Sequence, residues 1–260
     1  MEKIRILALG LALTAAGPAL ASELSPATSA APPASAAASD WSGFYLDGDA
    51  AWLRKAYTWN TDDAAGPNFN STFGLANSEV GLGGHLGYQR QFGWLVVGAE
   101  GGILASVGDR FASVTSPGTG AGLTCGLAFP GQMCQARIGA VLTYGGKLGV
   151  AWSDWLLYGV GGGAAGSVRS QVNLVGAGLA PGLADYTPSA NVNGWYVGGG
   201  VDYMLIKSKP FDVIVGVEYE HVELGVVQEY SSNNGFSPGY DQRALSAKVD
   251  AVLGKVTVKF

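Results

Sequence analysis

His221 has the neighbours that come closest to a catalytic arrangement in this sequence. It lies among three glutamates, Glu218, Glu220 and Glu223. Nucleophilic hydrolysis by such a group needs a serine within hydrogen-bond reach of the imidazole. The nearest serines in the sequence are Ser208 and Ser231, and neither lies within eight residues of His221. The sequence therefore favours a non-catalytic histidine, and a hydrolase would need a serine from a neighbouring strand.

A phosphate-binding motif is formally present at residues 161–166. Gly161, Gly163 and Gly166 have the GxGxxG spacing, and Asp185 follows about 20 residues later. The motif binds a dinucleotide when it opens a helix directly after a strand. Here it falls inside a predicted strand, where small side chains would face the interior of a barrel. We therefore expect no nucleotide cofactor.

With only two cysteines and two histidines, the sequence offers few of the side chains that bind transition metals. His85 and His221 fall on different predicted strands, and we expect His85 to be a hydrogen-bonded interior group.

Cys125 and Cys134 are nine positions apart in a predicted long loop. In an oxidising compartment they would form a disulfide. Closing so short a loop would contribute about 2–3 kcal/mol. We expect neither a metal nor another cofactor.

The segments that must position these groups alternate apolar and polar residues, so that each segment has two different faces. In residues 79–92 the apolar face is Val80, Leu82, Leu86, Tyr88 and Phe92, whereas the other face carries Glu79, His85, Gln89 and Gln91. A period of two indicates β-strands. The pattern predicts strands at about 43–57, 78–91, 95–108, 135–151, 155–169, 192–206, 211–226 and 242–260.

Aromatic residues mark the ends of the apolar faces. They include Tyr88, Phe92, Tyr144, Trp152, Trp195, Tyr203 and Tyr219. Two aromatic girdles around an aliphatic band are typical of membrane β-barrels, whereas the core of a soluble sandwich would hold its aromatics centrally. The alternation and the girdles together favour a barrel that crosses a membrane.

The breaks between the predicted strands alternate in length. Short breaks fall at residues 91–94, 152–155 and 207–210, and long breaks at 58–77, 109–134, 170–191 and 227–241. Short periplasmic turns and long extracellular loops produce this alternation. We predict an all-β fold, an eight-stranded antiparallel up-and-down transmembrane β-barrel of the outer-membrane type. It would span residues 40–260, carry four long extracellular loops and have both termini in the periplasm.

Composition excludes several other classes. After the N-terminus no apolar run reaches the roughly 18 residues of a membrane helix. The net charge of -5 and the absence of a basic patch argue against nucleic acid as a partner. Lys3 and Arg5 precede an apolar run at residues 6–16, and Ala19-Leu20-Ala21 fits the small-x-small cleavage pattern, which together predict a signal peptide at residues 1–21. Residues 22–39 are rich in Ala, Ser and Pro and predict a periplasmic linker.

The predicted inward faces carry charges of both signs. The expected polar network of the lumen is His85, Glu100, Arg137, Lys147, Asp202, Glu218, Glu220 and Lys255. Buried charges are costly unless they are paired, and an eight-stranded barrel is just wide enough for side chains to fill. We expect an ion-pair network that plugs the barrel; a narrow ion path is the alternative.

The last strand alternates toward a terminal aromatic residue. Val256, Val258 and Phe260 resemble the C-terminal signal that the outer-membrane assembly machinery of Gram-negative bacteria recognises. Leu245, Ala247 and Val249 have the opposite parity. If they also face the lipid, a β-bulge near residues 250–253 must reconcile the two halves of the strand.

Several segments resemble one protein family. They are Trp41-Ser42-Gly43-Phe44-Tyr45, Leu148–Trp152 with Trp155–Gly159, Gly194–Tyr203 and Val217–Gly225. The matching positions, with Phe260, are similar to those of the small outer-membrane barrel proteins of alphaproteobacteria, the outer-membrane immunogenic or porin-like family. His221 departs from the pattern, since the family more often has an aromatic residue there. The resemblance implies a surface antigen or a structural envelope protein and assigns no residue an activity.

Three functions follow as hypotheses. The first is a structural, surface-exposed barrel whose loops interact with a host or envelope ligand. The second is a small-conductance, porin-like channel, and the third is an enzyme that modifies lipid A. The expected partners are outer-membrane lipid and lipopolysaccharide, together with the assembly machinery.

Overall fold

The protein folds into a β-barrel in the computed structural model. The structure describes residues 39–62, 71–108, 110–115, 132–174, 184–186, 190–230 and 242–260. Over these ranges the chain forms ten strands: β1 (Gly43–Asp62), β2 (Ser71–Phe92), β3 (Leu95–Ser106), β4 (Ala112–Thr115), β5 (Gln132–Trp152), β6 (Trp155–Leu174), β7 (Ala184–Tyr186), β8 (Ala190–Ile206), β9 (Asp212–Tyr230) and β10 (Gln242–Lys259).

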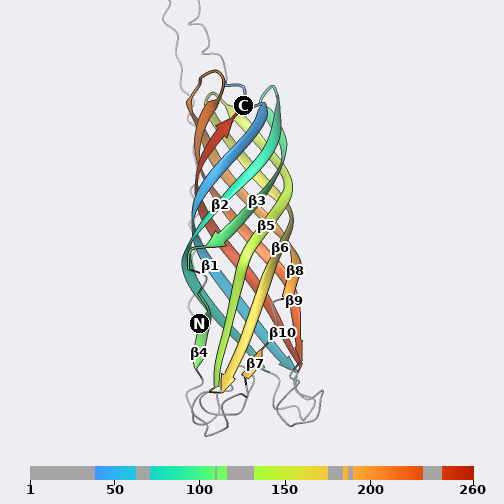
Figure 1. The fold of residues 1–260 in the computed structure, drawn as a ribbon. Helices are drawn as coiled ribbons and strands as arrows, with labels where there is room; N and C mark the ends of the chain where they lie inside the picture. Colours follow the sequence, from blue (N-terminus) through green and yellow to red (C-terminus); the bar gives the residue numbers. More distant parts are fainter. Residues whose placement is uncertain are drawn as a thin grey trace, which may run out of the picture. The chain divides into compact units, whose positions relative to one another are not determined.

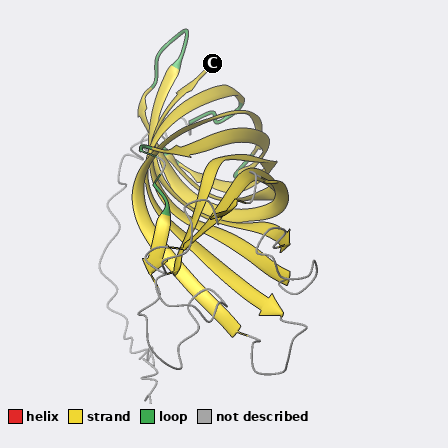
Figure 2. Cartoon of the chain, turned by 60° about the horizontal axis from the view of Figure 1, so that its bottom comes forward, coloured by secondary structure: helices red, strands yellow, loops and turns green. Residues whose placement is uncertain are grey.

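Antiparallel pairing runs through every strand and closes the sheet on itself (Figures 1 and 2). β1 pairs with both β2 and β10, and the β5–β6 pair closes the ring. β4 continues the line of β3 along β5, and β7 continues that of β8 along β6. The ten described strands therefore occupy eight positions around the barrel, which confirms the predicted fold class.

One end of the barrel carries the short connections, as predicted. β2 and β3 are joined through Gly93, whose φ is 64°, and β5 and β6 through Ser153, whose φ is 55°. The backbone N–H of Phe260 donates to the carbonyl of Phe44 over 2.8 Å, so the end of β10 is held beside the start of β1. We call this end, at the top of Figure 1, the short-turn end, and the opposite end the long-loop end.

The strands extend further toward the long-loop end than the sequence predicts. β1 continues to Asp62, β6 to Leu174 and β9 to Tyr230, while β5 already begins at Gln132. β2 has 22 residues and β10 has 18, whereas crossing a membrane takes about 9–11 residues per strand. Much of the wall therefore lies beyond the length that a lipid bilayer requires.

An apolar belt surrounds the half of the barrel nearer the short-turn end. Its exposed aliphatic residues include Leu46, Leu82, Leu86, Leu142, Leu148, Leu157, Val197, Val217 and Val256. Exposed aromatic residues at or near the short turns are Phe44, Tyr88, Phe92, Trp94, Trp152, Trp155, Phe211 and Phe260. Those further along the strands are Trp52, Tyr144, Trp195 and Tyr219. This is the predicted distribution of two aromatic girdles around an aliphatic band.

Polar side chains replace the apolar belt directly beyond Trp52. Trp52, Val252 and Tyr219 lie in register on β1, β10 and β9. Two residues closer to the long-loop end, the same strands carry Arg54, Asp250 and His221 in register. The outer face of the wall beyond this row is therefore suited to water or to lipid headgroups rather than to acyl chains.

The interior changes in the opposite sense along the barrel. Near the short-turn end it is polar, and this zone holds the candidate site described below. Closer to the long-loop end it is filled by apolar side chains, among them Leu53, Tyr57, Trp59, Ile138, Val222, Leu224, Leu245, Ala247 and Leu253, each no more than 2% exposed. The polar network predicted for the lumen therefore occupies only the zone near the short-turn end.

The predicted bulge near residues 250–253 is also wrong. β10 pairs with β1 without interruption from Lys259 to Gln242. The register shift lies instead between Leu245 and Ala247 in the pairing with β9. Leu245, Ala247 and Val249 are buried inside the barrel with the same parity as Lys255. No bulge is needed, because the apolar residues of this part of β10 face an apolar interior and not lipid.

No helix among the described residues is long and apolar enough to cross a membrane.

Candidate functional site

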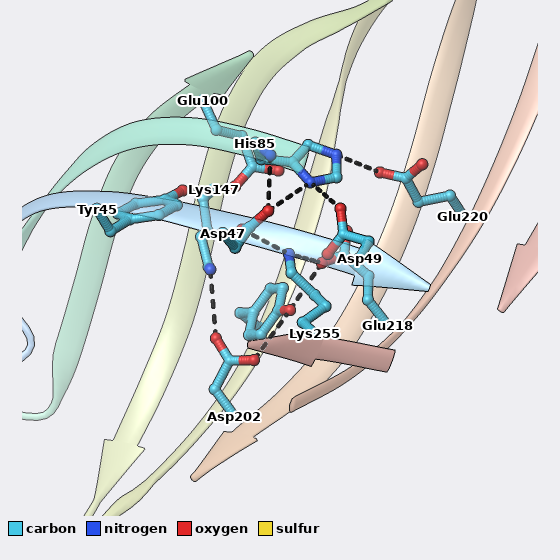
Figure 3. A network of polar contacts seen from close by, with 11 residues as sticks. Tyr45, Asp47, Asp49, His85, Glu100, Lys147, Asp202, Glu218, Glu220 and Lys255 are labelled. Atoms are coloured by element: carbon cyan, nitrogen blue, oxygen red, sulfur yellow. Dashed lines mark hydrogen bonds and ion pairs between the residues drawn. The ribbon is translucent and has the colours of Figure 1, made fainter. Parts of the chain in front are cut away.

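Strands from all around the barrel contribute to a buried polar cluster near the short-turn end (Figure 3). We call it the lumen cluster: Tyr45, Asp47 and Asp49 from β1, His85 from β2, Glu100 from β3, Lys147 from β5, Tyr158 from β6, Asp202 from β8, Glu218 and Glu220 from β9, and Lys255 from β10. Each of them is 6% exposed or less. Alternation along each strand turns these side chains inward while their sequence neighbours face outward.

Lys255 joins two sides of the lumen cluster. Its Nζ donates to Glu218 Oε2 over 2.6 Å and lies 3.4 Å from Asp47 Oδ2. β10 lies between β9 and β1, so the ammonium group reaches an acid from each neighbouring strand. The pairing offsets part of the cost of burying these three charges.

Two tyrosines extend the network across the lumen. Tyr158 Oη donates to Glu218 Oε2 over 2.7 Å, and Tyr45 Oη donates to Glu100 Oε2 over 2.6 Å. Lys147 Nζ lies 3.5 Å from Asp202 Oδ2 and 3.7 Å from the centre of the Tyr158 ring. The lysine therefore has both an ion pair and a cation–π contact inside the barrel.

His85 lies among three carboxylates. Asp47 Oδ1 accepts the backbone N–H of His85 over 2.6 Å and lies 3.0 Å from Nδ1 of the same residue. Asp49 Oδ2 is 2.9 Å from Nδ1, and Glu220 Oε1 is 3.6 Å from Nε2. Both ring nitrogens therefore face acids. Asp47, Asp49 and His85 also each present a ligand atom, all within 4.8 Å of one another, so they could hold a metal ion.

The structure brings seven of the eight residues predicted for the polar network into the lumen cluster. They are His85, Glu100, Lys147, Asp202, Glu218, Glu220 and Lys255. The prediction is wrong for Arg137, which lies on the outer face of the barrel. Its guanidinium is 4.8 Å from the centre of the Phe111 ring.

A β-bulge explains the position of Arg137. The pairing of β5 with β6 shifts register between Ile138 and Val141. Before this shift the even-numbered residues Ala136 and Ile138 are buried, and after it the odd-numbered Val141 and Lys147 are buried. An inserted residue reverses the face of everything beyond it, so the parity that places Lys147 inside places Arg137 outside.

Four functional residues of the lumen cluster were not predicted: Tyr45, Asp47, Asp49 and Tyr158. The signal for the first three was present, because Tyr45, Asp47 and Asp49 alternate with Phe44, Leu46 and Gly48. Continuing the period of two through the first strand would have found them. Nothing in the sequence indicated that they lie beside His85, since that contact depends on the pairing of β1 with β2.

Smaller polar contacts lie outside the lumen cluster. Lys55 lies 3.7 Å from Glu79 Oε2 and donates to the carbonyl of Ile138 over 2.8 Å, within the otherwise apolar zone. On the outer face, His221 Nδ1 is 2.7 Å from Asp250 Oδ1, and the imidazole packs against the Trp195 ring at 5.6 Å. His221 thus lies at the edge of the apolar belt, among acidic and aromatic partners.

At the short-turn end, Asp154 connects three segments of the chain. Its carboxylate forms an ion pair with Lys207 and accepts a hydrogen bond from the Ser39 hydroxyl. Its carbonyl accepts the backbone N–H of Met204 over 2.9 Å. The contacts with Lys207 and then with Ser39 hold the pKa of the Asp154 carboxyl below its usual value. The turn after β5 is thereby tied to the segment that precedes β1.

Other predictions fall on parts of the chain that the structure does not describe. Cys125 lies outside the described residues, and Cys134 lies on β5 without a described side chain, so the disulfide stays a prediction. The proposed signal peptide at 1–21 and nearly all of the linker at 22–39 also lie outside them. The glycine motif at 161–166 lies within β6 and opens no helix.

No protein-family model matches the chain, and no curated protein sequence does. Among solved structures, the chain is similar to Neisserial surface protein A, with 14% identity and a TM-score of 0.31 over 84% of this chain and 98% of that one. It is similar to Ail, the attachment invasion locus protein of Yersinia pestis, with 9% identity and a TM-score of 0.32 over 80% and 98% of the two chains. The outer membrane protein OprG of Pseudomonas aeruginosa has 10% identity and a TM-score of 0.44 over 84% and 96%. These similarities assign no activity.

Proposed function

We propose that this chain is an integral outer-membrane protein with a closed interior, which presents its long loops at the cell surface and has a structural or loop-mediated binding role. The observation that supports it is the pair of opposite gradients along the barrel. Beside the apolar belt the interior is polar, and beyond the belt the outer face is mostly polar and the interior mostly apolar. Such a wall crosses lipid with one half and projects into water with the other.

The orientation follows from the same gradients. The apolar belt lies toward the short-turn end, so that end would be periplasmic, with both termini of the barrel beside it. The long-loop end would project from the cell. Val256 and Phe260 are more than half exposed on the outer face. With Val258 they are available to the assembly machinery as a C-terminal signal.

Lipopolysaccharide is the partner that the outer face favours. Arg137 and Arg169 are directly opposite each other on β5 and β6, and Arg169 is exposed. Like charges opposite each other in a sheet repel, and a phosphate between two guanidinium groups would offset that repulsion. The lipid A part of lipopolysaccharide carries phosphates that two guanidinium groups could bind.

The long loops are the part of the chain where we propose that ligands bind. The resemblance to the porin-like family of alphaproteobacteria suggests a surface antigen, and a host or envelope ligand would bind the loops. A Cys125–Cys134 disulfide would brace the second long loop. Resistance of both cysteines to a thiol-alkylating reagent in unreduced protein tests that bond.

Planar-bilayer recording tests the closed interior. Purified protein inserted into a bilayer is expected to show no porin-like conductance, because the lumen cluster and the apolar zone both fill the cross-section. Conductance at the level of a porin, or sugar uptake in a liposome-swelling assay, would contradict the proposal and favour the porin-like channel.

A further inference from the structure

The barrel interior around His85 holds more acids than cations. The lumen cluster contains six carboxyl side chains, those of Asp47, Asp49, Glu100, Asp202, Glu218 and Glu220, against Lys147, Lys255 and His85. All nine are 6% exposed or less, so bulk water solvates them little. Burying unbalanced negative charge is costly unless protons or a cation offset it.

Asp49 is one of two acids in the lumen cluster without a hydrogen-bond partner for either oxygen among the described residues. Its side chain is fully buried. Asp49 Oδ2 instead points at Nδ1 of His85 from 2.9 Å. Buried polar atoms without hydrogen-bond partners are rare, and a bound ion is one of the few explanations for them.

The spacing of three atoms suits a metal ion. His85 Nδ1 is 3.0 Å from Asp47 Oδ1 and 2.9 Å from Asp49 Oδ2. Two ligands at a right angle, each about 2.1 Å from a cation, lie about 3.0 Å apart. Each aspartate oxygen thus stands at the separation from His85 Nδ1 that two neighbouring ligands of one ion would have, and all three ligand atoms lie within 4.8 Å of one another.

Glu220 supplies the group that usually supports a metal-binding histidine. Its Oε1 lies 3.6 Å from Nε2 of His85, and neither of its carboxylate oxygens has a hydrogen-bond partner among the described residues. A carboxylate beside one ring nitrogen holds the proton there and leaves the other nitrogen free to bind the metal. Figure 3 shows Glu220 facing one ring nitrogen, while Asp47 and Asp49 face the other.

We propose that Asp47, Asp49 and His85 bind a divalent transition-metal ion inside the barrel, through Nδ1 of His85 and one oxygen of each aspartate. The mixture of imidazole and carboxylates, with right-angle spacing and no thiolate, suits ions of the Mn²⁺ and Fe²⁺ type. Ca²⁺ would prefer oxygen ligands alone. The ion would offset the excess of negative charge and join β1 to β2 whether or not the barrel conducts.

Metal retention after refolding tests the site. Because the site is enclosed, the full-length protein is refolded into detergent micelles with EDTA or with Mn²⁺, then desalted and analysed for metal. We expect about one Mn²⁺ per chain. Asp49→Asn should retain less than a tenth of the parent's metal, and Glu220→Gln should bind Mn²⁺ about 10–100 times more weakly. Glu79→Gln, which removes a buried carboxylate outside the site, should retain the parent's amount.

A measurement on the parent protein keeps the test decisive if Asp49→Asn fails to fold. Pulsed electron paramagnetic resonance of the Mn²⁺-loaded protein should show coupling to an imidazole nitrogen, and His221→Gln should preserve it, since the chain has only two histidines. Absence of bound Mn²⁺ in the parent, absence of the nitrogen coupling, or equal retention by Asp49→Asn and Glu79→Gln would overturn the proposal.

Discussion

At the scale of single residues, Lys255 is the cation that stabilises the lumen cluster by pairing with two buried acids. Replacing it with Met keeps the length of the side chain but leaves Glu218 and Asp47 without their shared cation. Breaking a buried pair in this way costs about 3–5 kcal/mol. We expect Lys255→Met to lower the free energy of unfolding by that amount, measured by denaturant unfolding in lipid vesicles.

Lys248 offers the matched control on the same strand. Its Nζ is 3.4 Å from Glu223 Oε1, and both side chains are more than a third exposed. Exposed pairs contribute about 0–1 kcal/mol, so Lys248→Met should change the unfolding free energy little. Similar losses for the two variants would mean that the lumen cluster is solvated and not buried.

Gly102 shows how closely the interior is packed around His85. A Cβ atom at this position would lie 1.9 Å from Cδ2 of His85, which is its partner on β2. We expect Gly102→Ala to displace the imidazole and to destabilise the barrel by about 1–3 kcal/mol. At neighbouring Gly101 a Cβ would find its nearest atom 3.6 Å away. Gly101→Ala should therefore unfold like the parent, and equal thermal midpoints for the two alanine variants would contradict this packing.

At the scale of elements, the short-turn end is held by a contact that depends on pH. The folded pKa of Asp154 is below its usual value because of Lys207 and Ser39. The contribution to stability is therefore fully present above the unfolded pKa of about 4 and is lost as pH falls through the folded pKa. We expect Asp154→Ala to speed amide exchange at residues 39–42 relative to the parent at pH 6 but not near pH 2.

Lys209 provides the control for that experiment. It lies in the same turn as Lys207, but among the described residues the ion pair of Asp154 is with Lys207. For Lys209→Met, amide exchange at residues 39–42 should be as fast as in the parent across the pH range. A ratio for Asp154→Ala that does not change with pH would show that the carboxylate does not hold this segment.

We expect the end of the last strand to matter more for assembly into the membrane than for the stability of the folded barrel. Phe260 is 66% exposed and contributes one backbone hydrogen bond to β1. Deleting it should reduce the amount of barrel in the outer membrane more than it lowers the thermal midpoint of the barrel that does fold. Phe211→Ala removes another exposed aromatic residue from the same end and should assemble normally. Equal outer-membrane levels of the deletion and the parent would exclude a role in assembly.

At the scale of the whole molecule, the lumen cluster both closes and braces the barrel. Glu218 and Glu220 project inward from β9, and their replacement by Gln leaves Lys255 and His85 with fewer acids. We expect Glu218→Gln with Glu220→Gln to lower the thermal midpoint and to raise the leak current in a planar bilayer. Glu223→Gln, on the outer face of the same strand, should change neither. A double variant as stable and as tight as the parent would mean that the apolar zone alone closes the lumen.

The amino-acid sequence by itself determined the strands, their order and the face of most side chains. Alternation along a strand is a local property, so residues such as His85, Glu218 and Lys255 reveal their inward orientation without any knowledge of their neighbours. The short connections likewise require that the strands they join are antiparallel. These features depend only on residues that are close together in the chain.

Only the tertiary structure decided which inward residues meet, and where the two faces change character. Asp47 and Asp49 reach His85 through the pairing of β1 with β2, and the bulge before Val141 turns Arg137 outward. A shift of one residue exchanges the inward and outward faces of a strand. Alternation alone does not fix the register or the positions of bulges. The interior around Leu245 and Val249 is apolar because the wall there has passed the apolar belt, so apolar side chains turn inward. How far the wall extends beyond that belt depends on the folded barrel as a whole.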